Sequence, residues 1–244
     1  MAEAKKSVQG PRQKFRGKKY REVLKKVDRK KLYTLSDAVA LLTETSTTTF
    51  DSSAEIHLNM GIDPKQSDQL IRGTIALPHG TGKKVRVIAF VDTDKVKEAK
   101  AAGATEAGSD DLIEKINKGW LDFDVAIATA DQMKKMGKVA KTLGQKGLMP
   151  NPKAGTVTTT PGKTIEEIMK GRVEYKIDKE ANVHNVFGKI SFGKQKLEEN
   201  LRRYLKAITE AKPSAIKGNY INSITLVTTM GPGIHVAVGE AHSA

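Results

Sequence analysis

The alternation of apolar and polar residues changes character twice along this chain, and that change limits the possible folds more than any other feature. Over residues 54–60 apolar and polar residues alternate, which predicts a strand with one buried face. From Val85 to Val91 the sequence is almost continuously apolar, as in a strand buried on both faces of a parallel sheet. Alternating segments return after Gly171. We therefore expect the two ends of the chain to build one part of the fold and the middle to build another.

The two ends are predicted to form an antiparallel α+β part. A first helix should begin near Gly17, and Ser36 is a favourable N-cap for a second. Residues 194–211 repeat apolar residues at helical spacing, which predicts a long amphipathic helix. The strands expected here are 50–61, 72–77, 172–177, 186–190 and 221–227.

The middle is predicted to form βαβ units. Two helices are expected between strands at 85–91 and 124–128. The first contains Val96, Ala99 and Ala102 and ends at Gly103, and the second spans 109–118. A short basic helix follows over 133–143. Such alternation indicates a parallel sheet covered by helices.

These patterns predict a discontinuous α+β domain with an inserted α/β, Rossmann-like three-layer domain, the two joined by a hinge. The discontinuous domain would comprise residues 17–80 and 172–244, and the insert residues 81–171. Residues 1–16 are polar and poor in apolar content, so we expect a disordered basic arm.

The net charge of +14 is unevenly distributed and predicts a polyanionic partner. Residues 1–35 carry nine Lys and four Arg against three acidic residues. Aromatic residues make up only 5% of the chain, which disfavours a protein that binds single strands mainly by base stacking. The chain has no cysteine, which excludes disulfides and thiolate metal sites. It has no apolar run long enough to span a bilayer and no secretory signal pattern, so we expect a cytoplasmic protein without membrane contact.

No pattern predicts catalysis, a cofactor or a metal site. The segment Gly80–Lys83 resembles a phosphate-binding loop, but Leu77 stands where that motif needs glycine and Lys84 where it needs Ser or Thr. The five histidines show no metal-ligand spacing, and we interpret His57 and His235 as isolated surface or edge groups.

Five segments of the sequence resemble the large-subunit ribosomal protein L-one family, and the resemblance runs from about Tyr20 to Val236. The segments are GLMPNPKAGTV at 147–157, GIDPKQSDQLIRGTIALPHG at 61–80, GWLDFD at 119–124, NVHNVFGKISF at 182–192 and TTMGP at 228–232. The first is the most specific, with eleven residues and no gap. The arm before Gly17 is longer than is usual in this family, so its role is not carried over.

The resemblance implies a set of RNA-contacting residues. They are Phe50, Ser53, Glu55, His184, Lys189, Thr228, Thr229, Met230 and Gly231. The hinge is expected from the sequence itself, at the short linkers marked by Gly80, Gly82 and Gly171. For the segment around His184, an ordinary β-hairpin with Gly188 as its bulge is an equally good interpretation.

The resemblance also implies the partners. The chain would be a structural constituent of the large ribosomal subunit that binds large-subunit rRNA and forms the mobile stalk assisting release of deacylated tRNA from the exit site. It would also repress translation by binding its own operon mRNA, and it would be a monomer when free of the ribosome.

Two other classes of function remain open at this point. One is a DNA-binding architectural protein that uses the basic arm. The other is a Rossmann-like enzyme in which Asp92, Asp122 or Asp124 serves chemistry.

Deleting residues 1–16 is expected to reduce the salt dependence of RNA binding while leaving RNA preference intact. The arm carries five Lys and Arg against Glu3, and contacts to phosphates position a protein without reading sequence. Each lost phosphate contact should reduce the slope of log affinity against log salt by about 0.7 to 0.9. Loss of discrimination between RNAs in the shortened chain would show that the arm takes part in recognition.

Overall fold

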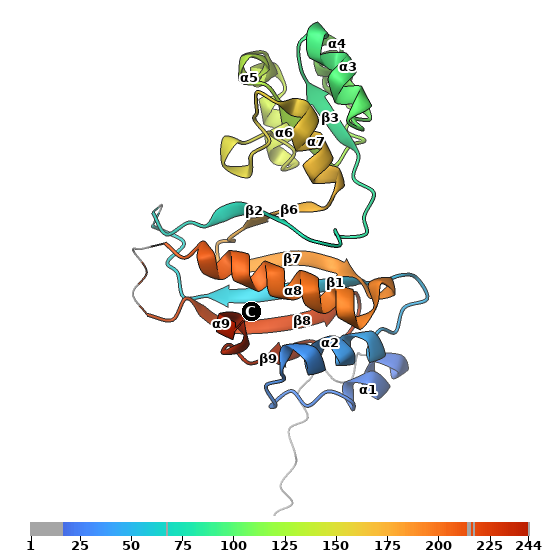
Figure 1. Ribbon diagram of the computed structural model, residues 1–244, viewed down its shortest axis with the longest axis vertical. Coiled ribbons are helices and arrows are strands. Elements are labelled where there is room, and N and C mark those ends of the chain that lie inside the picture. Colours follow the sequence, from blue (N-terminus) through green and yellow to red (C-terminus); the bar gives the residue numbers. More distant parts are fainter. Residues whose placement is uncertain (1–16, 67, 214–215, 217, 244) are drawn as a thin grey trace, which may run out of the picture.

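The molecule consists of two groups of elements stacked along its long axis (Figure 1). The computed structural model describes residues 17–66, 68–213, 216 and 218–243, so the predicted arm at 1–16 lies outside the described residues. We call residues 17–80 and 172–243 the flanking segments and residues 81–171 the central segment. The flanking segments contain α1 (Lys18–Leu24), α2 (Leu35–Glu44), β1 (Ser53–Met60), β2 (Arg72–Ala76), β6 (Arg172–Lys176), β7 (Asn182–Lys189), α8 (Gly193–Glu210), β8 (Ile221–Thr228), β9 (Ile234–Val236) and α9 (Glu240–Ser243).

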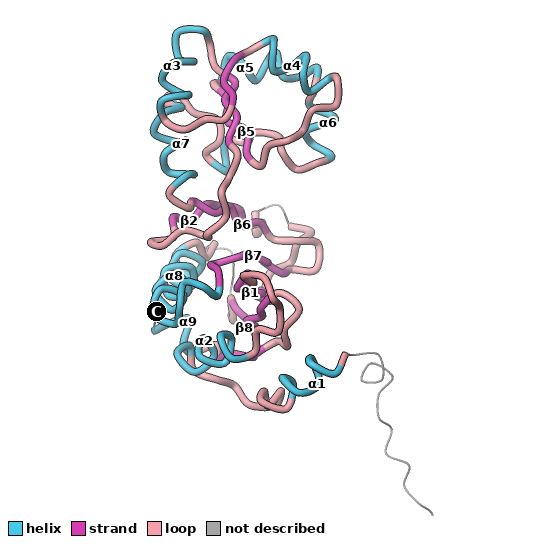
Figure 2. Tube along the Cα trace, turned by 90° about the vertical axis from the view of Figure 1, so that its right-hand side faces the viewer, coloured by secondary structure: helices cyan, strands magenta, loops and turns pink. Residues whose placement is uncertain are grey.

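The flanking segments build a four-stranded antiparallel sheet in the order β7-β1-β8-β9. β1 pairs with two strands from the C-terminal half, so neither end of the chain forms the sheet alone. Ala54, Ile56, Leu58 and Met60 are buried, as the alternation predicts. The helices α2, α8 and α9 lie on this face of the sheet (Figure 2), and the opposite face points outward.

The predicted long amphipathic helix is confirmed by α8. Its buried side chains include Leu197, Leu201, Leu205 and Ile208, which pack into the same apolar cluster as β1 and β8. The cap predicted for α2 is wrong. Thr34, not Ser36, is the N-cap, and its Oγ1 accepts a hydrogen bond from the Asp37 N–H at 3.2 Å. The helix begins earlier because Leu35, the first residue of α2, is fully buried.

The central segment contains a three-stranded parallel sheet in the order β4-β3-β5. Its elements are β3 (Val87–Phe90), α3 (Thr93–Ala101), β4 (Glu106–Gly108), α4 (Asp110–Asn117), β5 (Val125–Ala128), α5 (Ala130–Lys135), α6 (Ala140–Gln145) and α7 (Pro161–Met169). All four residues of β3 are buried, as a strand covered on both faces requires. Two apolar clusters lie on the two faces, one with α3 and α7 and the other with α4 and α6.

Two features of the central segment differ from the sequence prediction. β4 is a three-residue strand of Glu, Ala and Gly, which carries no strand pattern and exists because it pairs with β3. The basic segment 133–143 is not one helix, because a 3-10 turn at Met136–Lys138 separates α5 from α6. Met136, Val139 and Leu143 are nevertheless all fully buried in one cluster.

The two connections between the flanking and central segments pass next to each other. β2 and β6 form a two-stranded ribbon that lies between the four-stranded sheet and the central segment (Figures 1 and 2). Gly171, which directly precedes β6, has φ +102, and a Cβ on Gly171 would lie 2.2 Å from the Gly80 Cα. Asn200 of α8 is fully buried beside them. Its side-chain N–H groups donate to the carbonyl oxygens of Gly80 and Phe187 at 2.9 and 2.8 Å, and its Oδ1 accepts from the His79 N–H at 3.0 Å.

Gly171→Ala is expected to destabilise the chain more than Gly119→Ala does. Both glycines have φ near +100°, at +102 and +94, where an L side chain costs about 1–3 kcal/mol. A Cβ at position 119 meets nothing within 4 Å, whereas at position 171 it collides with backbone that has no side chain to rotate away. Urea denaturation of both variants should give a clearly larger loss for Gly171→Ala. Equal losses would show that the close approach of the two connections does not constrain the fold.

Candidate nucleic-acid interface

Two loops from distant parts of the sequence meet at one end of the four-stranded sheet. Ser53, which begins β1, accepts a hydrogen bond at its carbonyl oxygen from the Thr229 N–H at 3.1 Å, and its own N–H donates to the Thr229 Oγ1 at 3.1 Å. Next to this junction two large apolar side chains are exposed, Phe50 at 59% and Met230 at 74%. The structure therefore brings together Phe50, Ser53, Thr229 and Met230, which the resemblance named as RNA contacts.

Met230 lies at the tip of a tight turn and has an unfavourable backbone conformation. The Gly231 N–H donates to the Thr228 carbonyl oxygen at 2.7 Å, which closes the turn, and Met230 has φ 67. A positive φ at the third position of such a turn favours glycine, so methionine costs about 1–2 kcal/mol there. A Cβ on Gly231 would lie 2.1 Å from the Thr228 Oγ1, so any larger residue at 231 would displace the buried Thr228 side chain. The turn thus holds an exposed methionine at the expense of stability.

Thr228 does not lie on the surface with the other predicted contacts. Its side chain is 1% exposed and sits beneath Gly231, and within the described part of the chain its Oγ1 has no hydrogen-bond partner. We conclude that Thr228 shapes the turn and is not available to touch a ligand in this conformation.

Lys189 links β7 to the start of β1. Its Nζ donates to the Ser53 Oγ at 2.8 Å and to the Asp51 carbonyl oxygen at 3.3 Å. The sequence reasoning did not identify Asp51, whose carboxylate accepts hydrogen bonds from the Ser191 Oγ–H and N–H at 2.7 and 3.1 Å. The Ser191 hydroxyl is the main cause that lowers the pKa of Asp51, with the Ser191 N–H and the Lys189 charge adding to it. A fixed cation therefore lies directly beside Ser53.

The outward face of the sheet carries the remaining predicted contacts, Glu55 on β1 and His184 on β7. His57 is not the isolated group that the sequence suggested, because its Nδ1 lies 2.7 Å from the Nδ1 of His184. The second nitrogen of each ring faces a carboxylate: His184 Nε2 lies 3.3 Å from Asp178 Oδ2, and His57 Nε2 lies 3.8 Å from Glu55 Oε2. Burial is the main cause that lowers the pKa of His57, the His184 charge lowers it further, and Glu55 opposes both.

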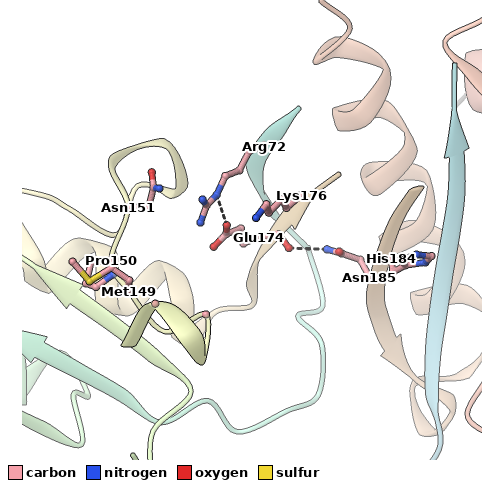
Figure 3. Close-up of a pocket in the computed structure, with 10 residues that line it drawn as sticks. Arg72, Met149, Pro150, Asn151, Glu174, Lys176, His184 and Asn185 are labelled. Atoms are coloured by element: carbon pink, nitrogen blue, oxygen red, sulfur yellow. Dashed lines mark hydrogen bonds and ion pairs between the residues drawn. The ribbon is translucent and has the colours of Figure 1, made fainter. Parts of the chain in front are cut away.

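The central segment faces this surface across two cavities. One, of about 520 Å³, is bounded by the loop at Met149–Asn151 on one side and by Arg72, Glu174 and His184 on the other. Figure 3 shows this loop opposite Arg72, whose Nε donates to Glu174 Oε1 at 2.6 Å. A second cavity of about 390 Å³ is lined by Ser53 and Lys189 of the flanking segments and by residues of the central segment such as Lys83.

The predicted hinge glycines lie beside these cavities. Gly80 and Gly171 are at the crossing of the two connections described above. Gly82 has φ 73 and packs against the Lys189 stem, with a Cβ position only 2.7 Å from the Lys189 Cγ.

The three aspartates considered for an enzyme are engaged in structural contacts. Asp92 accepts a hydrogen bond from the Gln132 side chain at 2.5 Å, and Asp122 pairs with Arg86. Asp124 pairs with Lys83 at 2.7 Å, and the hydrogen bond from Lys83 is the main cause that lowers its pKa. Among the described residues no group of three or more metal-ligating side chains is found. No helix in the described part of the chain is long and apolar enough to cross a membrane.

Comparison with known proteins identifies the family. Residues 42–232 match the model described as "Ribosomal protein L1p/L10e family". The chain is 52% identical to the "Large ribosomal subunit protein uL1" of Lactobacillus delbrueckii over 218 residues, which is 89% of this chain and 94% of that protein. It is 51% identical to the protein of the same name from Mycobacteroides abscessus, over 91% of this chain and 94% of that protein. The protein of that name from Protochlamydia amoebophila is 47% identical over 93% of this chain and 96% of its own length.

The match covers most of the chain and includes the central segment, residues 42–80 and 172–232 of the flanking segments, and with them the turn around Met230. The chain therefore belongs to the Ribosomal protein L1p/L10e family, and it is an rRNA-binding structural protein of the large ribosomal subunit rather than an enzyme.

Proposed function

We propose that the chain binds large-subunit rRNA through a contact strip at the end and on the outward face of the four-stranded sheet. The strip comprises Phe50, Ser53, Glu55, His184, Lys189, Thr229, Met230 and Gly231. The observation that carries this proposal is the strained turn that holds Met230 74% exposed, next to the exposed ring of Phe50. Residues in such conformations cluster at functional sites, and they persist only where the surrounding structure holds them.

The chemistry of the strip suits folded RNA. Phe50 and Met230 offer flat or flexible apolar surface to an unstacked base or a ribose, and the Lys189 cation suits a phosphate. The carboxylate of Glu55 and the hydroxyls of Ser53 and Thr229 suit 2′-hydroxyl groups, which DNA lacks. None of the eight residues lies within a helix placed to enter the major groove of a DNA duplex. Folded RNA is therefore favoured over the alternative of duplex DNA.

The flanking segments would act as one RNA-binding domain, at 17–80 and 172–244, and the central segment 81–171 as an inserted, Rossmann-like domain. This division is supported by the apolar clusters, since the largest cluster draws on the flanking segments and the two others on the central segment. Gly80, Gly82 and Gly171 would form the hinge between them, with Asn200 fixing the start of the first connection.

The same strip would serve a second RNA. An mRNA of the protein's own operon that presents the same backbone shape would compete for Phe50, Lys189 and Met230, and its binding would repress translation. In the ribosome the central segment would form the mobile stalk that helps release deacylated tRNA from the exit site. Its exposed lysines, among them Lys134, Lys138, Lys141 and Lys146, suit a polyanion of that kind.

Met230→Gly is expected to stabilise the chain and weaken its binding to rRNA. Glycine removes the strain at φ 67 but loses more chain entropy on folding, so the gain in unfolding free energy should be at most about 1 kcal/mol. Loss of an exposed apolar contact at an interface should cost about 2 kcal/mol of binding, or roughly thirtyfold in Kd. Urea denaturation and binding to a large-subunit rRNA transcript measure the two effects.

Ala181→Gly is the matched control for that experiment. Ala181 is the other described residue besides glycine with a positive φ, at 58, and it is buried in the turn between β6 and β7. This variant should change stability without changing RNA affinity. If Met230→Gly binds rRNA as tightly as the unaltered chain, Met230 is not a contact and the strip is wrongly placed.

Replacing residues 81–171 by a short Gly/Ser bridge should preserve rRNA binding. The bridge would span a very small gap, because Ala76 is paired with Arg172 and the Leu77 N–H donates to the Gly171 carbonyl oxygen at 3.4 Å. Every residue of the strip remains in the shortened chain. Affinity should stay within about tenfold of that of the full chain at two salt concentrations, the loss reflecting the lysines removed. A shortened chain that melts cooperatively but loses most of its affinity would place the principal site on the central segment.

A further inference from the structure

A row of polar side chains crosses the outward face of the four-stranded sheet. The strand register places His184 of β7 opposite His57 of β1, His57 opposite Thr225 of β8, and Thr225 opposite His235 of β9. Strands lie about 4.8 Å apart, so the row spans roughly 14 Å. It adjoins the contact strip directly, because Glu55 and His57 are successive outward residues of the same strand.

Within this row the two rings of His57 and His184 share a hydrogen bond that fixes where protons can lie. A distance of 2.7 Å between the two Nδ1 atoms requires one of them to carry a proton. If His184 donates its Nε2–H to Asp178, its Nδ1 is the acceptor and the His57 Nδ1–H is the donor. The His57 Nε2 then carries no proton, and its lone pair faces Glu55 Oε2, which lies 3.8 Å away. Two acceptors therefore face each other in the neutral pair.

One additional proton on the His57–His184 pair removes the repulsion between the two facing acceptors, whereas a second additional proton would create a new repulsion. A proton on His57 Nε2 converts the facing acceptors into an ion pair with Glu55 and leaves the bond between the rings intact. A further proton would have to go on the His184 Nδ1, where it would point at the His57 Nδ1–H. The pair is therefore built to take up one proton.

The negative charge of Glu55 is the reason why RNA binding would favour proton uptake by His57. A bare carboxylate at an RNA surface repels phosphates, yet Glu55 lies in the strip. In the described part of the chain His57 is the basic side chain within ion-pair distance of Glu55. A protonated His57 would neutralise Glu55 toward phosphate while leaving its oxygens free to accept hydrogen bonds from 2′-hydroxyls.

We propose that His57 is a further RNA-binding residue, and that the His57–His184 pair takes up one proton when rRNA binds beside Glu55. This inference rests on the proposed function of the contact strip and specifies the protonation state in which the strip binds. Glu55 and Asp178 are the carboxylates that face the two rings. The other charged or titratable groups nearby are Arg72, Glu174 and Lys176, which line a cavity with His184, and His235, which lies two strands from His57 on the same face.

The electrostatic environment of the free chain supports proton uptake on binding. Burial and the nearby His184 lower the pKa of His57, which favours the neutral form of this ring before RNA arrives. Nearby phosphates favour the charged form and raise that pKa in the complex. By reciprocity, rRNA affinity must rise as the pH falls through the same range.

The experiment is isothermal titration calorimetry of the full chain with a large-subunit rRNA transcript, in two buffers of different ionisation enthalpy at pH 7. The unaltered chain should take up a measurable fraction of one proton per complex. Affinity for the transcript should also be higher at pH 6 than at pH 8, because a protonated His57 neutralises Glu55 toward phosphate. The double variant His57→Gln/His184→Gln should lose both effects, and His235→Gln, which lies on the same face but bonds to Thr225 at 3.1 Å, should keep both.

The outcomes separate this inference from the proposed function. Failure of the unaltered chain to bind the transcript would overturn the proposed function itself. Binding without proton uptake, uptake that persists in the double variant, or uptake that is lost in His235→Gln would each overturn the inference alone. If the double variant does not fold, NMR of histidine-labelled unaltered chain decides the matter. The His57 ring should then titrate at a higher pH in the complex than in the free chain, and an unchanged midpoint would overturn the inference.

Discussion

The pairing of β1 with both β7 and β8 is the interaction on which the rest of the structure depends. β1 lies near the start of the chain, and its two partners lie more than 120 residues away in sequence. This pairing forces the chain to leave the flanking segments, build the central segment and return, which brings Gly80 and Gly171 side by side. It also buries Ile56 and Leu58 against α2 and α8, so the main apolar core exists only once both ends of the chain have met.

The two faces of β1 have different roles: one packs in the apolar core and the other carries residues of the proposed contact strip. The strict alternation of a strand sends Ala54, Ile56 and Leu58 into the core and leaves Ser53, Glu55 and His57 on the outward face. Because a slip of one residue would exchange the two sets, the apolar core fixes the register that positions the proposed contact strip. The strained turn at Met230 also depends on β1, because the two hydrogen bonds between Ser53 and Thr229 attach the turn to the start of this strand.

The start of the first connection between the flanking and central segments is fixed from within the core. The buried side chain of Asn200 hydrogen-bonds the His79 N–H and the Gly80 carbonyl oxygen, where an unpaired amide would be costly. Directly beyond it the chain passes through Thr81 and Gly82, and Gly82 packs against the stem of Lys189, a residue of the proposed contact strip.

Sequence periodicity alone determined the buried face of β1, the stripe of α8, the fully buried β3 and the change of architecture near Gly80 and Gly171, because each follows from residues close together in the chain. The resemblance of the segment 147–157 and of the turn 228–232 determined the family. Only the tertiary structure decided that 133–143 breaks at Met136, that β4 is a strand and that Thr228 is buried. It alone paired His57 with His184, 127 residues apart. The physical reason is that these features depend on pairing and packing between residues far apart in the chain, and no local pattern of residues specifies that.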